Sequence, residues 1–167
     1  MGCLFSCLSC CSSCTLLPDC CRLRCLKKKK YSFPFKRYHC YVQEVIDGDT
    51  FHITFFIKSV PITMKLRLLG VDTPEMSSKN PLEKEVAREV TEFLKKRIEH
   101  RYFPCELIKH DKYGGRVVGK LFYKGRDLTE ILLKHSLGKC YEGGNKGEWT
   151  EVELNNIKKE LVMFRKV

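Results

Sequence analysis

Long hydrophobic runs are missing from this chain of 167 residues. No segment approaches the roughly 18 consecutive apolar residues that a membrane-spanning helix requires, so the sequence does not predict one. Acidic residues are scarce at the N-terminus. Up to Arg37 the chain contains eight Lys and Arg residues and a single acidic residue, Asp19. The formal net charge of +11 is therefore concentrated in this segment, and nucleic acid or an anionic membrane surface is the expected partner.

Cysteines are few outside the N-terminal segment. Eight of the eleven lie in the first 25 residues, and only Cys40, Cys105 and Cys140 lie in the remainder. Such scatter indicates reduced thiols and not a disulfide framework. Pairs such as Cys7 and Cys10 could hold zinc, although no histidine lies nearby and adjacent cysteines are unusual for a zinc finger. A secretory signal is another alternative, although the positively charged n-region is missing.

The first residues favour lipid anchoring over these alternatives. Gly2 becomes N-terminal once the initiator methionine is removed, and Ser6 supplies the preferred hydroxyl for N-myristoylation, while Cys3 lies beside the acyl chain for palmitoylation. One myristoyl chain binds membranes only marginally, so the cysteines and the polybasic segment 27–30 provide the second signal. We therefore expect residues 1–37 to be a disordered lipid-anchor tail and linker on the cytoplasmic face of a membrane, which we take to be the plasma membrane.

Hydrophobic periodicity divides the remainder, residues 38–167, into strands and helices. Three segments have helical spacing and start signals, and they begin near Asn80, Asp127 and Thr150. Five segments have the pattern of short strands: 41–46, 50–57, 62–70, 105–110 and 116–123. This order predicts an α+β domain, a five-stranded OB-fold β-barrel with three helices.

Carboxylates and arginines gather at the ends of the predicted strands. Asp49 and Asp72 are hard oxygen donors with no His or Cys beside them, which favours calcium over zinc. The Glu75 carboxylate is suited to position or deprotonate the attacking water in phosphodiester hydrolysis. Arg67 and Arg116 are suited to bind the phosphate as forked donors. Seen singly, each has an ordinary explanation, because aspartates shape turns and the other side chains can be solvated charges.

Three motifs between about residues 39 and 164 resemble the staphylococcal nuclease-like (thermonuclease) family. Residues 45–50, Val-Ile-Asp-Gly-Asp-Thr, are similar to its first metal motif, and residues 66–75, Leu-Arg-Leu-Leu-Gly-Val-Asp-Thr-Pro-Glu, to its second. Residues 111–116, Asp-Lys-Tyr-Gly-Gly-Arg, resemble the third, except that Gly115 intervenes before the arginine and leaves the register of Arg116 open.

The resemblance implies roles for individual residues. It implies calcium ligation by Asp49, Asp72 and the Thr73 carbonyl, and catalysis by Arg67, Glu75 and Arg116. It also implies nucleotide contacts by Lys112 and Tyr113 and base stacking by Tyr141, for which core packing is an equal alternative. Because these roles are catalytic, an Arg67→Gly or Glu75→Ser variant is expected to lose activity with little unfolding.

The implied activity is calcium-dependent endonuclease or exonuclease cleavage of DNA and RNA to 3′-phosphorylated products by a monomer. Plant members of the family are likewise thought to carry an acylated N-terminus. The alternatives are a catalytically silent module that binds nucleic acid or a partner at a membrane, and a membrane scaffold in which the fold is incidental. The retained carboxylates and arginines argue against a silent copy.

Overall fold

A computed structural model describes residues 35–111, 115–144 and 146–165. Within these ranges the chain forms eight strands and three helices. In chain order they are β1 (Arg37–Asp47), β2 (Thr50–Ile57), β3 (Val60–Leu68), β4 (Gly70–Asp72), α2 (Pro81–Ile98), β5 (Tyr102–His110), β6 (Arg116–Tyr123), β7 (Arg126–Asp127), α3 (Leu128–Lys134), β8 (Lys139–Tyr141) and α4 (Glu151–Arg165).

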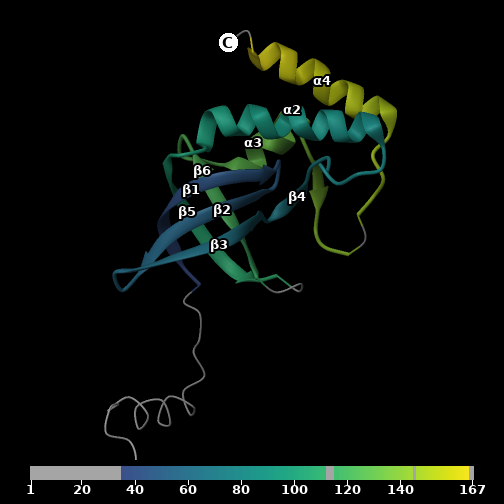
Figure 1. Ribbon diagram of the computed structural model, residues 1–167. Coiled ribbons are helices and arrows are strands. Elements are labelled where there is room, and N and C mark those ends of the chain that lie inside the picture. Colours follow the sequence, from purple (N-terminus) through teal and green to yellow (C-terminus); the bar gives the residue numbers. More distant parts are fainter. Residues whose placement is uncertain (1–34, 112–114, 145, 166–167) are drawn as a thin grey trace, which may run out of the picture. The chain divides into compact units, whose positions relative to one another are not determined.

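The five longer strands close into a barrel (Figure 1). β1 pairs antiparallel with β2 and β5, β2 pairs with β3, and β5 pairs with β6. The closure is the parallel pairing of β3 with β6, in which Lys65 lies opposite Arg116 and Leu68 opposite Gly119. Only glycine suits this junction, because a Cβ at Gly119 would lie 2.2 Å from the carbonyl oxygen of Glu106. The predicted α+β fold, an OB-type barrel with three helices, is confirmed.

The alternation in β2 shows how the barrel interior forms. Phe51, Ile53 and Phe55 are fully buried, whereas His52 and Thr54 are only half-buried. Successive side chains of a strand point to opposite faces, so a period of two places the apolar set in the core. The sequence predicted this arrangement correctly.

Helix α2 begins where the sequence predicts. The Asn80 side chain accepts a hydrogen bond from the backbone N–H of Leu82, and Pro81 occupies the first helical position, where no N–H is required. Its buried stripe, which includes Val90 and Leu94, packs on the barrel through β1, and α4 lies beside α2 on the other side (Figure 1). The helix therefore connects the barrel to the C-terminal helix.

Some boundaries differ from those predicted. The strand predicted at 41–46 is longer in the structure, because β1 begins at Arg37, which pairs with Glu106 of β5. Helix α3 ends at Lys134, because Ser136 adopts the left-handed conformation (φ 53°) that terminates it. The short strands β4 and β8 pair with each other, which the sequence did not predict.

Two sequence-based expectations concern the membrane and the cysteines. Among the described residues, every helix is too short or too polar to span a bilayer. Cys40, Cys105 and Cys140 are free thiols, the first two buried and the third exposed. The predicted lipidation residues Gly2 and Cys3 lie outside the described residues.

Candidate active site

A polar cavity of about 840 Å³ opens where the β1–β2 turn, the end of β3 and the start of β6 meet. A neighbouring cavity of about 390 Å³ is lined by Asp72 and shares Glu75 and Lys146 with the first. Five of the predicted site residues line the larger cavity: Asp49, Arg67, Glu75, Arg116 and Tyr141. The structure thus brings residues from distant parts of the sequence to one end of the barrel.

The strand pairing explains how the first two carboxylates meet. Asp49 directly precedes β2, and its carbonyl oxygen accepts a hydrogen bond from the Leu68 backbone N–H at 2.8 Å. Gly48 allows the turn to pack closely, since a Cβ there would lie 2.7 Å from the Thr73 hydroxyl oxygen. Asp72 ends β4, which follows β3 after one residue. The turn and the two strand ends therefore carry both aspartates to the same place.

Arg67 joins the two aspartates. Its Nη1 lies 2.6 Å from Asp49 Oδ2 and its Nη2 lies 3.2 Å from Asp72 Oδ1. The side chains are 11%, 5% and 6% exposed, respectively, so these ion pairs are shielded from solvent. Burial raises the pKa of Asp49, and the positive charge of Arg67 and a hydrogen bond from Thr50 Oγ1 oppose this rise. In strand 62–70, alternation with Leu66 and Leu68 predicts that Arg67 lies on the face opposite the core, whereas the aspartates bury it.

Lys146 is a second cation in the carboxylate cluster, and sequence reasoning did not identify it. Its Nζ lies 2.7 Å from Asp72 Oδ1 and also contacts Glu75 Oε1. Burial alone would lower the pKa of Lys146, but the hydrogen bonds to Asp72 and Glu75 raise it. The hydrogen bond from Lys146 lowers the pKa of Glu75, which keeps this carboxylate ionised. No motif or spacing in the sequence marks this lysine.

Arg116 and Tyr141 complete the larger cavity. Arg116 on β6 lies opposite Lys65 on β3. Lys65 and Arg67 are two residues apart and therefore point to the same face of the sheet, so Arg116 and Arg67 also share this face. Arg116 Nη2 contacts Asp111 Oδ2 at 2.5 Å. The Tyr141 ring lies 5.4 Å from the Arg67 guanidinium carbon. Tyr141 therefore packs beside Arg67 at the cavity, and its stacking on a base stays a prediction.

Two predicted nucleotide contacts cannot be placed. Lys112 and Tyr113 lie outside the described residues. The adjacent residues Asp111 and Arg116 are described, and their backbones are joined by a hydrogen bond of 3.0 Å from the Asp111 N–H to the Arg116 carbonyl. The third motif therefore begins and ends at the edge of the larger cavity.

The donor chemistry of the cluster fits a hard cation. Asp49 and Asp72 offer carboxylate oxygens, and the Thr73 hydroxyl is buried and makes no hydrogen bond to any described residue. Across residues 35–111, 115–144 and 146–165, no group of three or more His, Cys, Asp or Glu side chains is arranged to hold a metal ion. Two aspartates supply part of a calcium shell, which in proteins is completed by carbonyls, waters and substrate oxygens.

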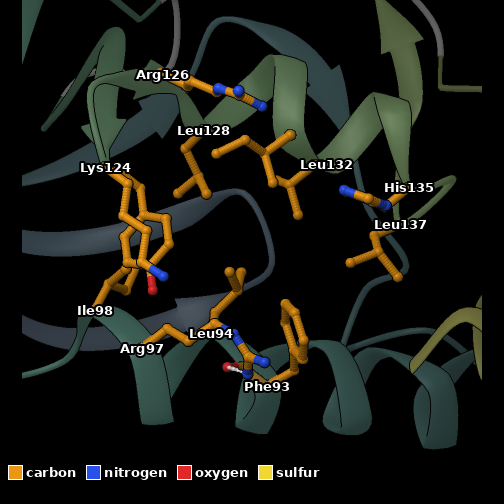
Figure 2. Close-up of a pocket in the computed structure, with 12 residues that line it drawn as sticks. Phe93, Leu94, Arg97, Ile98, Lys124, Arg126, Leu128, Leu132, His135 and Leu137 are labelled. Atoms are coloured by element: carbon orange, nitrogen blue, oxygen red, sulfur yellow. Dashed lines mark hydrogen bonds between the residues drawn. The ribbon is translucent and has the colours of Figure 1, made fainter. Parts of the chain in front are cut away.

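A further cavity of about 500 Å³ has a different character (Figure 2). It lies between α2 and α3, and Leu94, Leu128 and Leu132 point into it, with Arg97 and Arg126 nearby (Figure 2). No acidic side chain is among its described lining residues. This cavity therefore offers no ligands for a hard cation, and the carboxylate cluster is the stronger candidate site.

The fold and the site define a class of protein, an OB-type barrel with helices and with a carboxylate–arginine cluster at its strand ends. A family model described as "Staphylococcal nuclease homologue" matches residues 65–161. Because this range is more than half of the chain, the chain belongs to that family. The match includes Arg67, Asp72, Glu75, Arg116 and Tyr141 but begins after Asp49, whose place in the site depends on the contact with Arg67.

Three relatives agree with this assignment. The chain is 28% identical to "Probable endonuclease lcl3" of Schizosaccharomyces japonicus over an alignment of 129 residues. This alignment covers 63% of this chain and 55% of that protein. It is 26% identical to a protein of Schizosaccharomyces pombe that is also named a probable endonuclease, over 72% of this chain and 61% of the relative. "Probable endonuclease LCL3" of Komagataella phaffii is 26% identical, over 78% of this chain and 68% of that protein. The chain therefore spans less than two thirds of the first two relatives.

Proposed function

We propose that this protein is a nuclease that hydrolyses phosphodiester bonds of DNA and RNA, and that it depends on calcium. The observation that carries the proposal is the Arg67 bridge between Asp49 and Asp72, with Glu75 and Arg116 lining the same cavity. Carboxylates for a cation, a positioned base and fixed positive charge are the groups that this hydrolysis requires. The relatives are named probable endonucleases, which supports the nuclease part of the proposal.

Asp49, Asp72 and the Thr73 carbonyl are the proposed calcium ligands. When bound there, calcium would supply positive charge to polarise the phosphate and stabilise its developing negative charge. The choice of calcium follows from the carboxylate oxygens of Asp49 and Asp72, because hard oxygen donors favour a hard cation over zinc. The silent binding module remains the competing function.

Glu75 is the proposed base. Its pKa is lowered, mainly by the hydrogen bond from Lys146, so the carboxylate is ionised at neutral pH and can accept a proton from water. Its side chain is 43% exposed and lines the larger cavity, which gives water access to it. Glu75 therefore combines the correct charge state with an accessible position.

Arg67 and Arg116 are the proposed phosphate-binding cations. Arg67 uses two guanidinium nitrogens on the aspartates, and a guanidinium has five N–H donors, so it retains donors for a phosphate oxygen. Arg116 approaches the cavity from the neighbouring strand β6. We assign Lys112, Tyr113 and Tyr141 to the nucleotide side of the site, and we propose products that carry the phosphate on the 3′ side.

The N-terminal segment is proposed to tether the enzyme to the cytoplasmic face of the plasma membrane. The support is the sequence alone: Gly2 and Cys3 fit acylation, and the basic residues that follow fit an anionic leaflet. Each basic residue near such a leaflet contributes about 1 kcal/mol. We further propose that the enzyme acts as a monomer.

The test is a nuclease assay on the full chain. Plasmid DNA and a single-stranded RNA should both be degraded with calcium and spared with a chelator, and phosphatase should release phosphate from the 3′ ends. Glu75→Gln should lower kcat by about 10²–10⁴-fold, the usual contribution of general base catalysis. Glu85→Gln is the matched control, because Glu85 contacts Lys158 on the surface and lies outside both polar cavities. Intact nucleic acid that still binds the protein would support the silent module instead.

A further inference from the structure

The loop between β8 and α4 places a lysine in the carboxylate cluster. Lys146 Nζ contacts Asp72 Oδ1 at 2.7 Å and Glu75 Oε1. These carboxylates are 71 and 74 residues away along the chain, so the contact depends on the fold and not on local sequence. The Lys146 side chain is 35% exposed and that of Asp72 is 6% exposed, so one end of the contact is shielded from water.

Lys146 uses an oxygen that the proposed calcium site also needs. Asp72 Oδ1 accepts a hydrogen bond from Arg67 Nη2 and also contacts Lys146 Nζ. A calcium ion ligated by Asp72 at about 2.3–2.6 Å would lie close to both cations. Like charges at such distances repel strongly in a partly buried site. The Arg67 side chain is 11% exposed and that of Lys146 is 35% exposed, so Lys146 is the cation that can move into solvent.

The glycines on either side of Lys146 lack close neighbours, and the loop is held by hydrogen bonds from Tyr141 to the Gly144 carbonyl and from Lys139 to the Glu148 carbonyl. Gly143 and Gly144 have φ values of 104° and 100°, which favour glycine, and a Cβ at either of them or at Gly147 would meet nothing within 4 Å. The loop is therefore not fixed by close packing at these positions. A displaced lysine would remain tethered near the larger cavity, which it already lines.

We propose that Lys146 is a tethered counter-cation that a divalent metal ion must displace from Asp72 and Glu75, so that this lysine sets the metal affinity of the site. The inference rests on the proposed function, because it takes Asp72 as a calcium ligand. It goes beyond that function by naming a residue that weakens metal binding. Lys146 keeps the carboxylates paired in the metal-free protein and gives them up to the metal.

Calcium titration by calorimetry tests the proposal on the full chain, with calcium alone as the probe. Lys146→Met removes the competing charge and keeps the length of the side chain, and it should bind calcium about tenfold more tightly, which equals ~1.4 kcal/mol. Lys146→Arg keeps the charge and should bind like the parent. Lys95→Met is the matched control, because Lys95 is similarly exposed, contacts Glu92 on α2 and lines neither polar cavity. It should leave the calcium affinity unchanged.

Thermal unfolding gives a second readout that needs no activity. Without calcium, Lys146→Met should melt below the parent because Asp72 and Glu75 lose a partner, and saturating calcium should remove this difference. Parent-like or weaker calcium binding by Lys146→Met would overturn the role of Lys146 and leave the calcium site standing. Two results would overturn both the calcium site and the inference. The first is that the parent binds no calcium, and the second is that an Asp72→Asn variant binds calcium as tightly as the parent.

Discussion

Replacing Arg67 by Met should destabilise the metal-free protein strongly, because Arg67 compensates two buried carboxylates. Breaking a buried ion pair by removing one partner costs about 3–5 kcal/mol. Thr50 still donates to Asp49 and Lys146 still contacts Asp72, so we expect the lower end, about 3 kcal/mol. Sequence reasoning expected little unfolding on loss of Arg67, and the buried contacts predict the opposite.

Urea unfolding of Arg67→Met in the presence of a chelator measures this loss. A domain of this size changes its Tm by roughly 4 °C per kcal/mol, so a fall of roughly 12 °C is expected in a thermal scan. Calcium should recover part of the loss, because a ligand that binds only the folded state stabilises it, by about 2.7 kcal/mol at one hundred times its Kd. The recovery should exceed the stabilisation of the parent, since calcium replaces the missing positive charge.

Arg37→Met is the control for the loss of an arginine as such. Arg37 pairs with Glu106 at 3.7 Å, and its side chain is 79% exposed, so its removal should change stability by no more than about 0.5 kcal/mol. A metal-free Arg67→Met protein that unfolds within 1 kcal/mol of the parent would refute the reasoning. That result would mean that the aspartates do not need the guanidinium.

Three further predictions test separate parts of the molecule. Gly119→Ala should lose at least about 1–3 kcal/mol in urea unfolding, because the new Cβ would meet the Glu106 carbonyl oxygen; parent-like stability would contradict this. Glu153 accepts from the Thr150 N–H and contacts Lys139, and these interactions lower its pKa to about 2. The stability it contributes should therefore be full above the ordinary pKa of 4.5 and be lost as the pH falls towards 2; Glu153→Gln should remove this dependence in unfolding curves between pH 2 and 6. Gly2→Ala should release the protein from membranes in cell fractionation, and continued membrane binding would contradict the anchor.

Local features of the fold could be predicted because they follow from short-range chemistry. The Asn80 cap and the alternation in β2 depend only on neighbouring residues, and both are present in the structure. The barrel class followed from the number and order of the strands, whereas its closure by the parallel pairing of β3 with β6 did not. The position of Asp49 beside Asp72 was implied by the family motifs, and the structure joins them through Arg67.

The remaining features depend on contacts between distant segments. The pairing of β4 with β8 joins three-residue strands that have no pattern of their own, and it places Tyr141 opposite Gly70. The burial of Arg67 could not be read from alternation, because it results from the acidic side chains that cover its face of β3 at the barrel end. Lys146 reaches Asp72 across a glycine-containing loop whose path the sequence does not specify.

The charges around the larger cavity explain why a divalent ion and the substrate should bind cooperatively. Its described lining contains five acidic side chains, Asp47, Asp49, Glu75, Asp111 and Glu142, and four basic ones, Arg67, Lys109, Arg116 and Lys146. Without a metal ion this balance is slightly negative, so a polyanion gains little from entering. With Asp72 included the excess is two negative charges, which calcium would neutralise, and calcium would free the Lys146 ammonium for phosphate. Calcium should therefore tighten the binding of an uncleaved oligonucleotide to Glu75→Gln, and by linkage the oligonucleotide should tighten calcium binding by the same factor.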